Sequence, residues 1–150
     1  MTSQPPTIII VDDDEGHAIL ARESLEGAGF RNRIRHLRDG QTALDFFFQT
    51  GPGEVLVPGQ TYLVLLDIRM PKVDGIEVLR RLKAHPELRK LPVIMLTTTD
   101  DLREVERCHQ CGCSVYIQKP VDFGRFSEAI RRLGLFLLLL HVPPVGGGER

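Results

Sequence analysis

Five short runs with strand character, spaced along the whole chain, constrain its fold more than any other feature. They lie at Thr7–Val11, Arg33–Leu37, Tyr62–Leu66, Pro92–Leu96 and Val115–Gln118. Three of them are apolar on both faces, which is typical of strands buried in a parallel sheet, whereas Arg33–Leu37 alternates only weakly and resembles an edge strand.

Stretches with helical spacing follow these runs. We predict helices at His17–Ala28, Gln41–Gln49 and Gly75–His85. A fourth helix is capped by Asp100 or Asp101 and runs to about Cys111. A last helix is capped by Asp122 and starts near Phe123. Asp14 is expected to cap the first helix, Asp39-Gly40 to form a turn, and Thr50–Gln60, with three Gly and two Pro, to form a loop. Alternating strands and helices predict an α/β fold: a doubly wound, five-stranded parallel sheet with helices on both faces.

Composition excludes several classes of protein. Length predicts one domain, and 19 basic against 20 acidic residues give a net charge of -1, without the basic excess of a dedicated nucleic-acid binder.

The N-terminus lacks the basic start of a signal peptide, and the longest apolar run, Leu135–Leu140, is far shorter than the roughly 20 residues that span a bilayer. Three cysteines between Cys108 and Cys113 define no disulfide framework. We therefore expect a cytoplasmic protein without a membrane partner.

Polar residues follow the predicted buried strands. Asp12, Asp13 and Asp14 come after the first, Asp67 after the third, Thr97 after the fourth and Lys119 after the fifth. The carboxyl ends of parallel strands meet at one edge of a sheet, where sites in such folds lie. Carboxylates gathered there repel one another and must take up protons or bind a cation. A hard divalent ion such as Mg²⁺ suits oxygen ligands of this kind.

These residues resemble the receiver domain of bacterial two-component response regulators, over Thr7 to about Leu133. The resemblance rests on Asp12-Asp13, on Asp67 within LLDIRMPKVDG, on Thr97 closing PVIMLT, and on Lys119-Pro120 closing YIQKP. It implies the flavodoxin-like receiver fold and a phosphoacceptor that assists its own phosphorylation and dephosphorylation but is not an enzyme.

The resemblance assigns a role to each matching position. Asp67 would accept a phosphoryl group from a sensor histidine kinase, and Mg²⁺ would bind Asp13, Asp67 and the backbone carbonyl of Arg69, with Asp12 acting through water. Three residues would respond to the phosphoryl group: Lys119 would pair with its oxygens, Thr97 would be drawn toward Asp67, and Tyr116 would then turn inward. Pro120 is expected in cis, which would aim Lys119 at the site.

Two positions depart from the commonest pattern of the family. Thr98 stands where a small residue is usual, and Arg69 places a bulky cation beside the expected metal. Both would line the path by which water attacks the acyl phosphate. We therefore expect an altered rate of dephosphorylation.

The C-terminal part predicts partners. We divide the chain into a flexible N-terminus (1–6), a receiver domain (7–133), an apolar C-terminal arm (134–145) and a disordered tail (146–150). Only 17 residues follow Leu133, too few for a DNA-binding module. The apolar arm favours a homodimer formed through the last helix and this arm. Docking to a kinase and a slightly overlong core helix are the alternatives. The long loop at Thr50–Gln60 and the arm resemble stand-alone response regulators paired with phytochrome kinases, which implies a bacteriophytochrome as the kinase.

Other readings remain open at this point. A receiver-fold scaffold could regulate its kinase by binding alone, without phosphorylation. An aspartyl-phosphate phosphatase is disfavoured, because Arg69 stands where such enzymes carry a second aspartate. The cluster formed by Cys108, His109, Cys111 and Cys113 could bind zinc or sense redox state, but its spacing also fits helix positions packed into the core.

Overall fold

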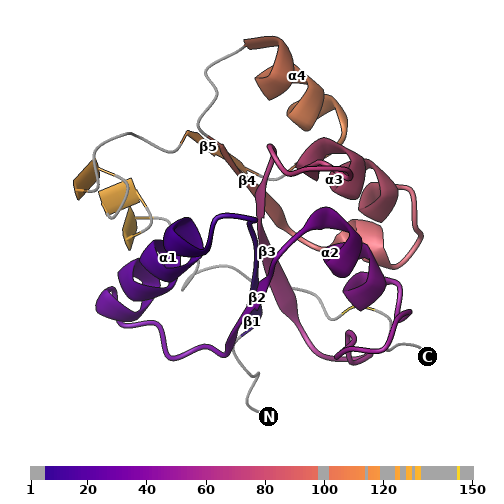
Figure 1. The fold of residues 1–150 in the computed structure, drawn as a ribbon, viewed down its shortest axis with the longest axis horizontal. Coiled ribbons are helices and arrows are strands. Elements are labelled where there is room, and N and C mark those ends of the chain that lie inside the picture. Colours follow the sequence, from indigo (N-terminus) through magenta and orange to yellow (C-terminus); the bar gives the residue numbers. More distant parts are fainter. Residues whose placement is uncertain are drawn as a thin grey trace.

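A computed structural model describes residues 6–97, 102–113, 115–118, 124–125, 128–129, 131–132 and 145 of the chain. Its centre is a parallel five-stranded sheet of order β2-β1-β3-β4-β5 (Figure 1). The strands are β1 (Thr7–Val11), β2 (Ile34–Leu37), β3 (Tyr62–Asp67), β4 (Val93–Thr97) and β5 (Val115–Gln118). The predicted doubly wound sheet is confirmed, with β2 at one edge.

Helices cover both faces of this sheet. They are α1 (Glu15–Gly27), α2 (Gly40–Phe47), α3 (Gly75–Lys83) and α4 (Leu102–Gln110), with a short 3₁₀ turn, η1 (Leu88–Lys90), before β4. In Figure 1, α1 lies on one side of the strands and α2 and α3 lie on the other. Within the described part of the chain, no helix is long and apolar enough to cross a bilayer.

The alternation of side chains along the strands explains this layering. In β1, Ile9 and Val11 pack into the core beneath α2, α3 and α4, whereas Ile8 and Ile10 pack beneath α1. Successive side chains of a strand point to opposite faces, so a strand with helices on both sides must be apolar throughout. The same holds for β3, whose six residues are all buried.

Aspartates begin three of the helices. The side chains of Asp14, Asp39 and Asp74 accept hydrogen bonds from backbone N–H groups in the first turns of α1, α2 and α3, at 3.1, 2.7 and 2.9 Å. Each carboxylate satisfies a donor that has no partner within its helix and lies at the positive end of the helix dipole. The Thr42 hydrogen bond also lowers the pKa of Asp39 below its usual value. The prediction for Asp14 is confirmed, while Asp39-Gly40 forms a helix start rather than a separate turn.

The second predicted helix ends earlier than its spacing indicated. α2 stops at Phe47, and Gln49 adopts a left-handed backbone conformation with φ of 59°. Within α2, Phe46 is buried beside Leu44 and Phe47, whereas Phe48, just past its end, is half-buried and packs against the same core. The Phe48 ring also packs edge to face with that of His85.

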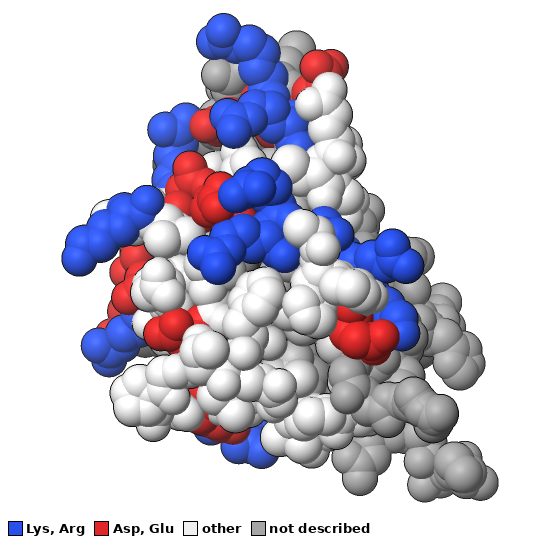
Figure 2. All heavy atoms as spheres, turned by 90° about the vertical axis from the view of Figure 1, so that its right-hand side faces the viewer, with Lys and Arg blue, Asp and Glu red and all other residues white. Residues whose placement is uncertain are grey.

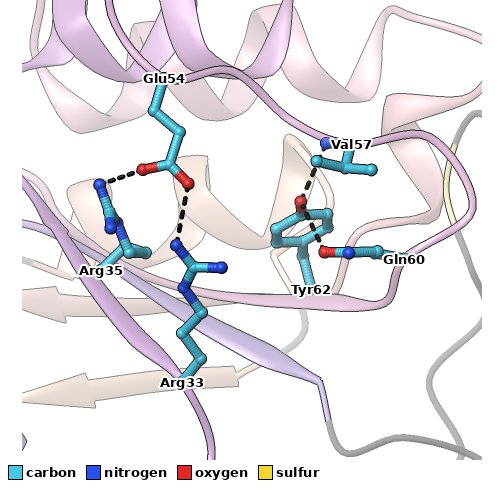
Figure 3. Close-up of polar contacts among 6 residues, drawn as sticks. All are labelled: Arg33, Arg35, Glu54, Val57, Gln60 and Tyr62. Carbon is cyan, nitrogen blue, oxygen red and sulfur yellow. Dashed lines mark hydrogen bonds and ion pairs between the residues drawn. The ribbon is translucent and has the colours of Figure 1, made fainter.

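The long loop after α2 is held by polar contacts at both ends (Figure 3). Glu54 bridges Arg33, just before β2, and Arg35, within β2. Nearer to β3, the Tyr62 hydroxyl accepts a hydrogen bond from the Val57 N–H at 2.9 Å and donates to Gln60 at 3.3 Å. The loop predicted at Thr50–Gln60 is therefore confirmed, and its Glu54 contacts the edge strand β2.

One described residue lies in the predicted C-terminal arm. Val145 is fully buried in the core beneath α2 and α3, its carbonyl accepts from Gly59 N–H at 3.0 Å, and its own N–H donates to Gln60 O at 3.3 Å. This end of the arm packs against its own chain. Residues 1–5, 133–144 and 146–150 lie outside the described part, and so do the expectations made for them.

Gly75 provides a test of how closely α3 approaches β3. A Cβ at this position would lie 2.0 Å from the backbone oxygen of Asp67, a distance that requires the backbone to move. We expect Gly75→Ala to lower the free energy of unfolding by about 2–3 kcal/mol, measured by urea denaturation.

Gly27, the last residue of α1, is the matched control, since a Cβ there would meet nothing within 4 Å. Gly27→Ala should stabilise the protein by about 0.5–1 kcal/mol. Equal effects at the two glycines would show that α3 does not lie this close to Asp67.

Candidate functional site

Three carboxylates meet at the carboxyl edge of the sheet. Val11 is the register partner of Leu66, so Asp12 and Asp67 follow at the ends of neighbouring strands. One oxygen from each of Asp12, Asp13 and Asp67 lies within 4.8 Å of the others. The residues Asp12 and Asp67 are buried, at 3% and 8% exposure, whereas Asp13 is exposed. This is the arrangement expected where the order of strands reverses, between β1 and β3.

The turn after β1 fixes the position of Asp12. Its carboxylate accepts a hydrogen bond from the N–H of Asp14 at 2.9 Å, and Asp14 in turn caps α1. Its backbone carbonyl accepts from Nε2 of His36, on β2, at 2.7 Å. Asp12 is therefore held from the helix side and from the edge strand.

The segment after β3 fixes the backbone of Asp67. The N–H of Gly75 donates to the carbonyl of Ile68 at 2.8 Å, and the missing side chain of Gly75 lets the start of α3 rest on Asp67. Gly40, at the start of α2, approaches the carbonyl of Val73 in the same way, since a Cβ there would lie 2.2 Å from it. Two glycines thus allow two helix starts to close around the loop that leaves Asp67.

The electrostatics of this cluster favour a cation. Two carboxylates about 4 Å apart repel by roughly 4 kcal/mol at an effective dielectric of 20. Oxygen ligands, two buried and one open to solvent, suit a hard divalent ion that keeps some of its water. The residues present therefore fit a Mg²⁺ site.

The other predicted site residues are placed only in part. Thr97 ends β4 opposite Gln118 of β5, and Tyr116 lies within β5, so both belong to strands of the expected edge. The side chains of Thr97 and Tyr116 lie outside the described part of the structure, as do residues Thr98, Lys119 and Pro120. Of the predicted site, the structure thus describes the side chains of Asp12, Asp13, Asp67 and Arg69.

Arg69 makes a contact that the sequence did not predict. Its guanidinium lies 3.3 Å from a carboxylate oxygen of Glu104, on α4. The two residues are 35 positions apart, and no periodicity or motif connects them. Only the packing of α4 beside the loop after β3 brings them together.

Comparison with known proteins identifies the family. The family model for the response regulator receiver domain matches residues 8–131 of the chain. The receiver domain of a response regulator from Rhodospirillum rubrum is 42% identical, with a TM-score of 0.87 over 94% of this chain and 99% of that one.

Two further solved structures are similar. The Mn²⁺-bound form of response regulator Rcp1 is 29% identical, with a TM-score of 0.84 over 93% of this chain and 99% of its own. The bacteriophytochrome response regulator AtBRR is 36% identical, with a TM-score of 0.67 over 92% of this chain and 99% of its own. The similarity therefore extends over most of each relative.

The cysteine cluster packs as part of the core. Cys108 and Cys113 are buried and Cys111 is half-buried, and all three are free thiols. Among the described residues, the carboxylate trio is the one group with its ligand atoms placed to hold a metal. Burial raises the pKa of Cys108 to about 12 and also raises that of Cys113. The core interpretation of this cluster is confirmed for Cys108 and Cys113.

Charged side chains of both signs lie on the face formed by α2, α3 and α4. Figure 2 shows Lys and Arg side chains mixed with Asp and Glu on this side of the molecule. Ion pairs within it include Arg80 with Glu77 on α3, and Lys90 with Glu87 around η1.

Thiol reactivity tests the placement of the cysteines. Because the thiolate is the reactive form, burial should make Cys108 slow to alkylate, while the half-buried Cys111 reacts first. We expect iodoacetamide at mildly alkaline pH to label Cys111 well before Cys108, as read by peptide mass spectrometry. The Cys111→Ser variant should lose the fast phase, and urea should make all three cysteines reactive. Equal rates for Cys108 and Cys111 in the folded protein would contradict the burial described here.

Proposed function

This chain belongs to the response regulator receiver domain family, and on that premise we propose that Asp67 accepts a phosphoryl group from a sensor histidine kinase in a Mg²⁺-dependent reaction. The observation that carries the proposal is the meeting of Asp12, Asp13 and Asp67 within 4.8 Å at the carboxyl edge of the sheet. The protein is a phosphoacceptor that takes part in its own phosphorylation and dephosphorylation, and it relays a signal through a change of conformation.

The metal site supports this chemistry. Asp13, Asp67 and the backbone carbonyl of Arg69 would hold Mg²⁺, and Asp12 would act through water. The ion would offset the repulsion between an anionic nucleophile and an anionic phosphoryl donor. The Mn²⁺-bound form of the related Rcp1 supports a divalent ion in a fold of this kind.

The contribution of this chain to phosphoryl transfer is to position the carboxylate of Asp67. An Asp67 carboxylate oxygen bonds to phosphorus while the P–N bond of the kinase's phosphohistidine breaks, and the electron pair of that bond returns to the imidazole. The product on Asp67 is an acyl phosphate. Burial of Asp67 at the strand end limits the directions from which a donor can approach.

The phosphoryl group would then change the structure nearby. Lys119, aimed by a cis Pro120, would pair with its oxygens, and Thr97 would hydrogen-bond another oxygen and move toward Asp67. Tyr116 would turn inward after Thr97. A local gain of charge would thus select a second packing of β4 and β5. Thr98 and Arg69 would flank the path of water to the acyl phosphate and would set the rate of hydrolysis.

The partners follow from similarity and from the arm. Similarity to the bacteriophytochrome response regulator AtBRR favours a bacteriophytochrome as the kinase, in the cytoplasm. We propose a homodimer formed through the last helix and the arm at 134–145, with no direct binding to DNA. Because Val145 packs into its own core, the contact between copies would involve the arm before this residue.

Intact-mass spectrometry after incubation with acetyl phosphate tests the proposal. We expect a single phosphoryl adduct on the wild-type protein with Mg²⁺, and none with a chelator or in the Asp67→Asn variant. Acetyl phosphate is used because it donates a phosphoryl group without a kinase.

Asp45→Asn is the matched control, since Asp45 lies on α2, outside the acidic cluster, and its carboxylate accepts hydrogen bonds from Gln41 and Thr50. This variant should be phosphorylated like the wild type. A folded, Mg²⁺-bound protein that forms no adduct would contradict the proposal and leave the phosphorylation-independent scaffold.

A further inference from the structure

The ion pair between Arg69 and Glu104 joins two parts of the molecule that the proposed function treats separately. Arg69 lies in the loop after β3, two residues beyond Asp67, and Glu104 lies in the first turn of α4. The Arg69 side chain is 62% exposed and that of Glu104 is 22% exposed. The contact therefore joins an exposed guanidinium to a half-buried carboxylate, and solvent reaches the pair.

A pocket gives the Arg69 side chain room to move. It has a volume of about 400 Å³ and is lined by Ile68, Arg69, Met70, Pro71, Asp74 and Glu104. It thus lies between the loop that leaves Asp67 and the first turn of α4. Arg69 and Glu104 both line this pocket, so a guanidinium released from Glu104 has open space beside the loop that follows Asp67.

We propose that Glu104 is a positioning residue that holds Arg69 away from the phosphoacceptor, and that phosphorylation of Asp67 transfers Arg69 from Glu104 to the phosphoryl group. This inference rests on the proposed function of Asp67. It adds a residue on α4 to the control of the acyl phosphate, and it gives a direct route from the phosphoryl group to α4.

The relative strengths of the two contacts support the exchange. An exposed Arg–carboxylate pair contributes little, because water and salt screen it. A phosphoryl group carries more negative charge and offers several acceptor oxygens, to which a guanidinium can bind in a two-pronged manner. Formation of the acyl phosphate therefore favours the Arg69–phosphoryl contact over the Arg69–Glu104 contact.

The exchange has two consequences. Arg69 at the phosphoryl group covers the solvent side, along which water must approach, and so slows hydrolysis. Glu104 loses its partner at the same time, so α4 loses one of its links to the loop after β3. The lifetime of the phosphorylated state and the position of α4 are thereby coupled through one side chain.

The half-life of the acyl phosphate tests this coupling. The full-length protein is phosphorylated with acetyl phosphate and Mg²⁺, the donor is removed, and the decay is followed by intact mass. We expect Glu104→Gln to lengthen the half-life by about three- to fivefold, the range that loss of one exposed ion pair can supply. Arg69→Ala should shorten the half-life, and adding Glu104→Gln to Arg69→Ala should change it no further.

Two further variants separate positioning from a structural effect. Glu104→Asp keeps the charge and should restore a half-life near that of the wild type, while Glu106→Gln, at an exposed glutamate of the same helix, should leave it unchanged. An unchanged or shorter half-life in Glu104→Gln, or an equal change in the Arg69→Ala background, would overturn the inference. Absence of any adduct on the wild type would instead refute the proposed function, so the two failures are distinct.

Discussion

The repulsion among Asp12, Asp13 and Asp67 is the interaction on which the rest of this structure depends. Three carboxylates within 4.8 Å of one another, two of them buried, oppose folding unless a cation or protons compensate them. A large apolar core on each face of the sheet outweighs this cost. The cluster therefore lowers stability at one edge of the sheet, and a divalent cation bound there would reduce the repulsion.

Backbone geometry makes this arrangement specific. Parallel register sets Val11 opposite Leu66 and so brings Asp12 level with Asp67. Gly75 allows α3 to begin against the backbone of Asp67, and the Asp14 N–H fixes the carboxylate of Asp12. None of these contacts involves a reacting atom, but together they position the carboxylate oxygens that would bind a metal ion and accept a phosphoryl group.

Sequence reasoning predicted the sheet and the acidic site because both depend on local patterns. Strands buried on both faces must be apolar throughout, and the polar residues that end them must meet at one edge. Predictions from the sequence failed for features that depend on tertiary packing. The second predicted helix extended to Gln49, but α2 ends at Phe47 and Gln49 adopts a left-handed backbone conformation. The Arg69–Glu104 pair and the burial of Val145 join distant segments, and no local pattern could have indicated them.

Chemical denaturation of the wild type and Asp13→Asn, each in excess Mg²⁺ and in a chelator, tests most directly whether the carboxylate cluster is strained and relieved by a cation. Asp13 is the member to change, because it is exposed and its loss leaves the core intact. The account predicts that Mg²⁺ stabilises the wild type, and that Asp13→Asn is more stable than the wild type in chelator and responds little to Mg²⁺. Equal stability of the wild type with and without Mg²⁺, together with a destabilised Asp13→Asn, would contradict it.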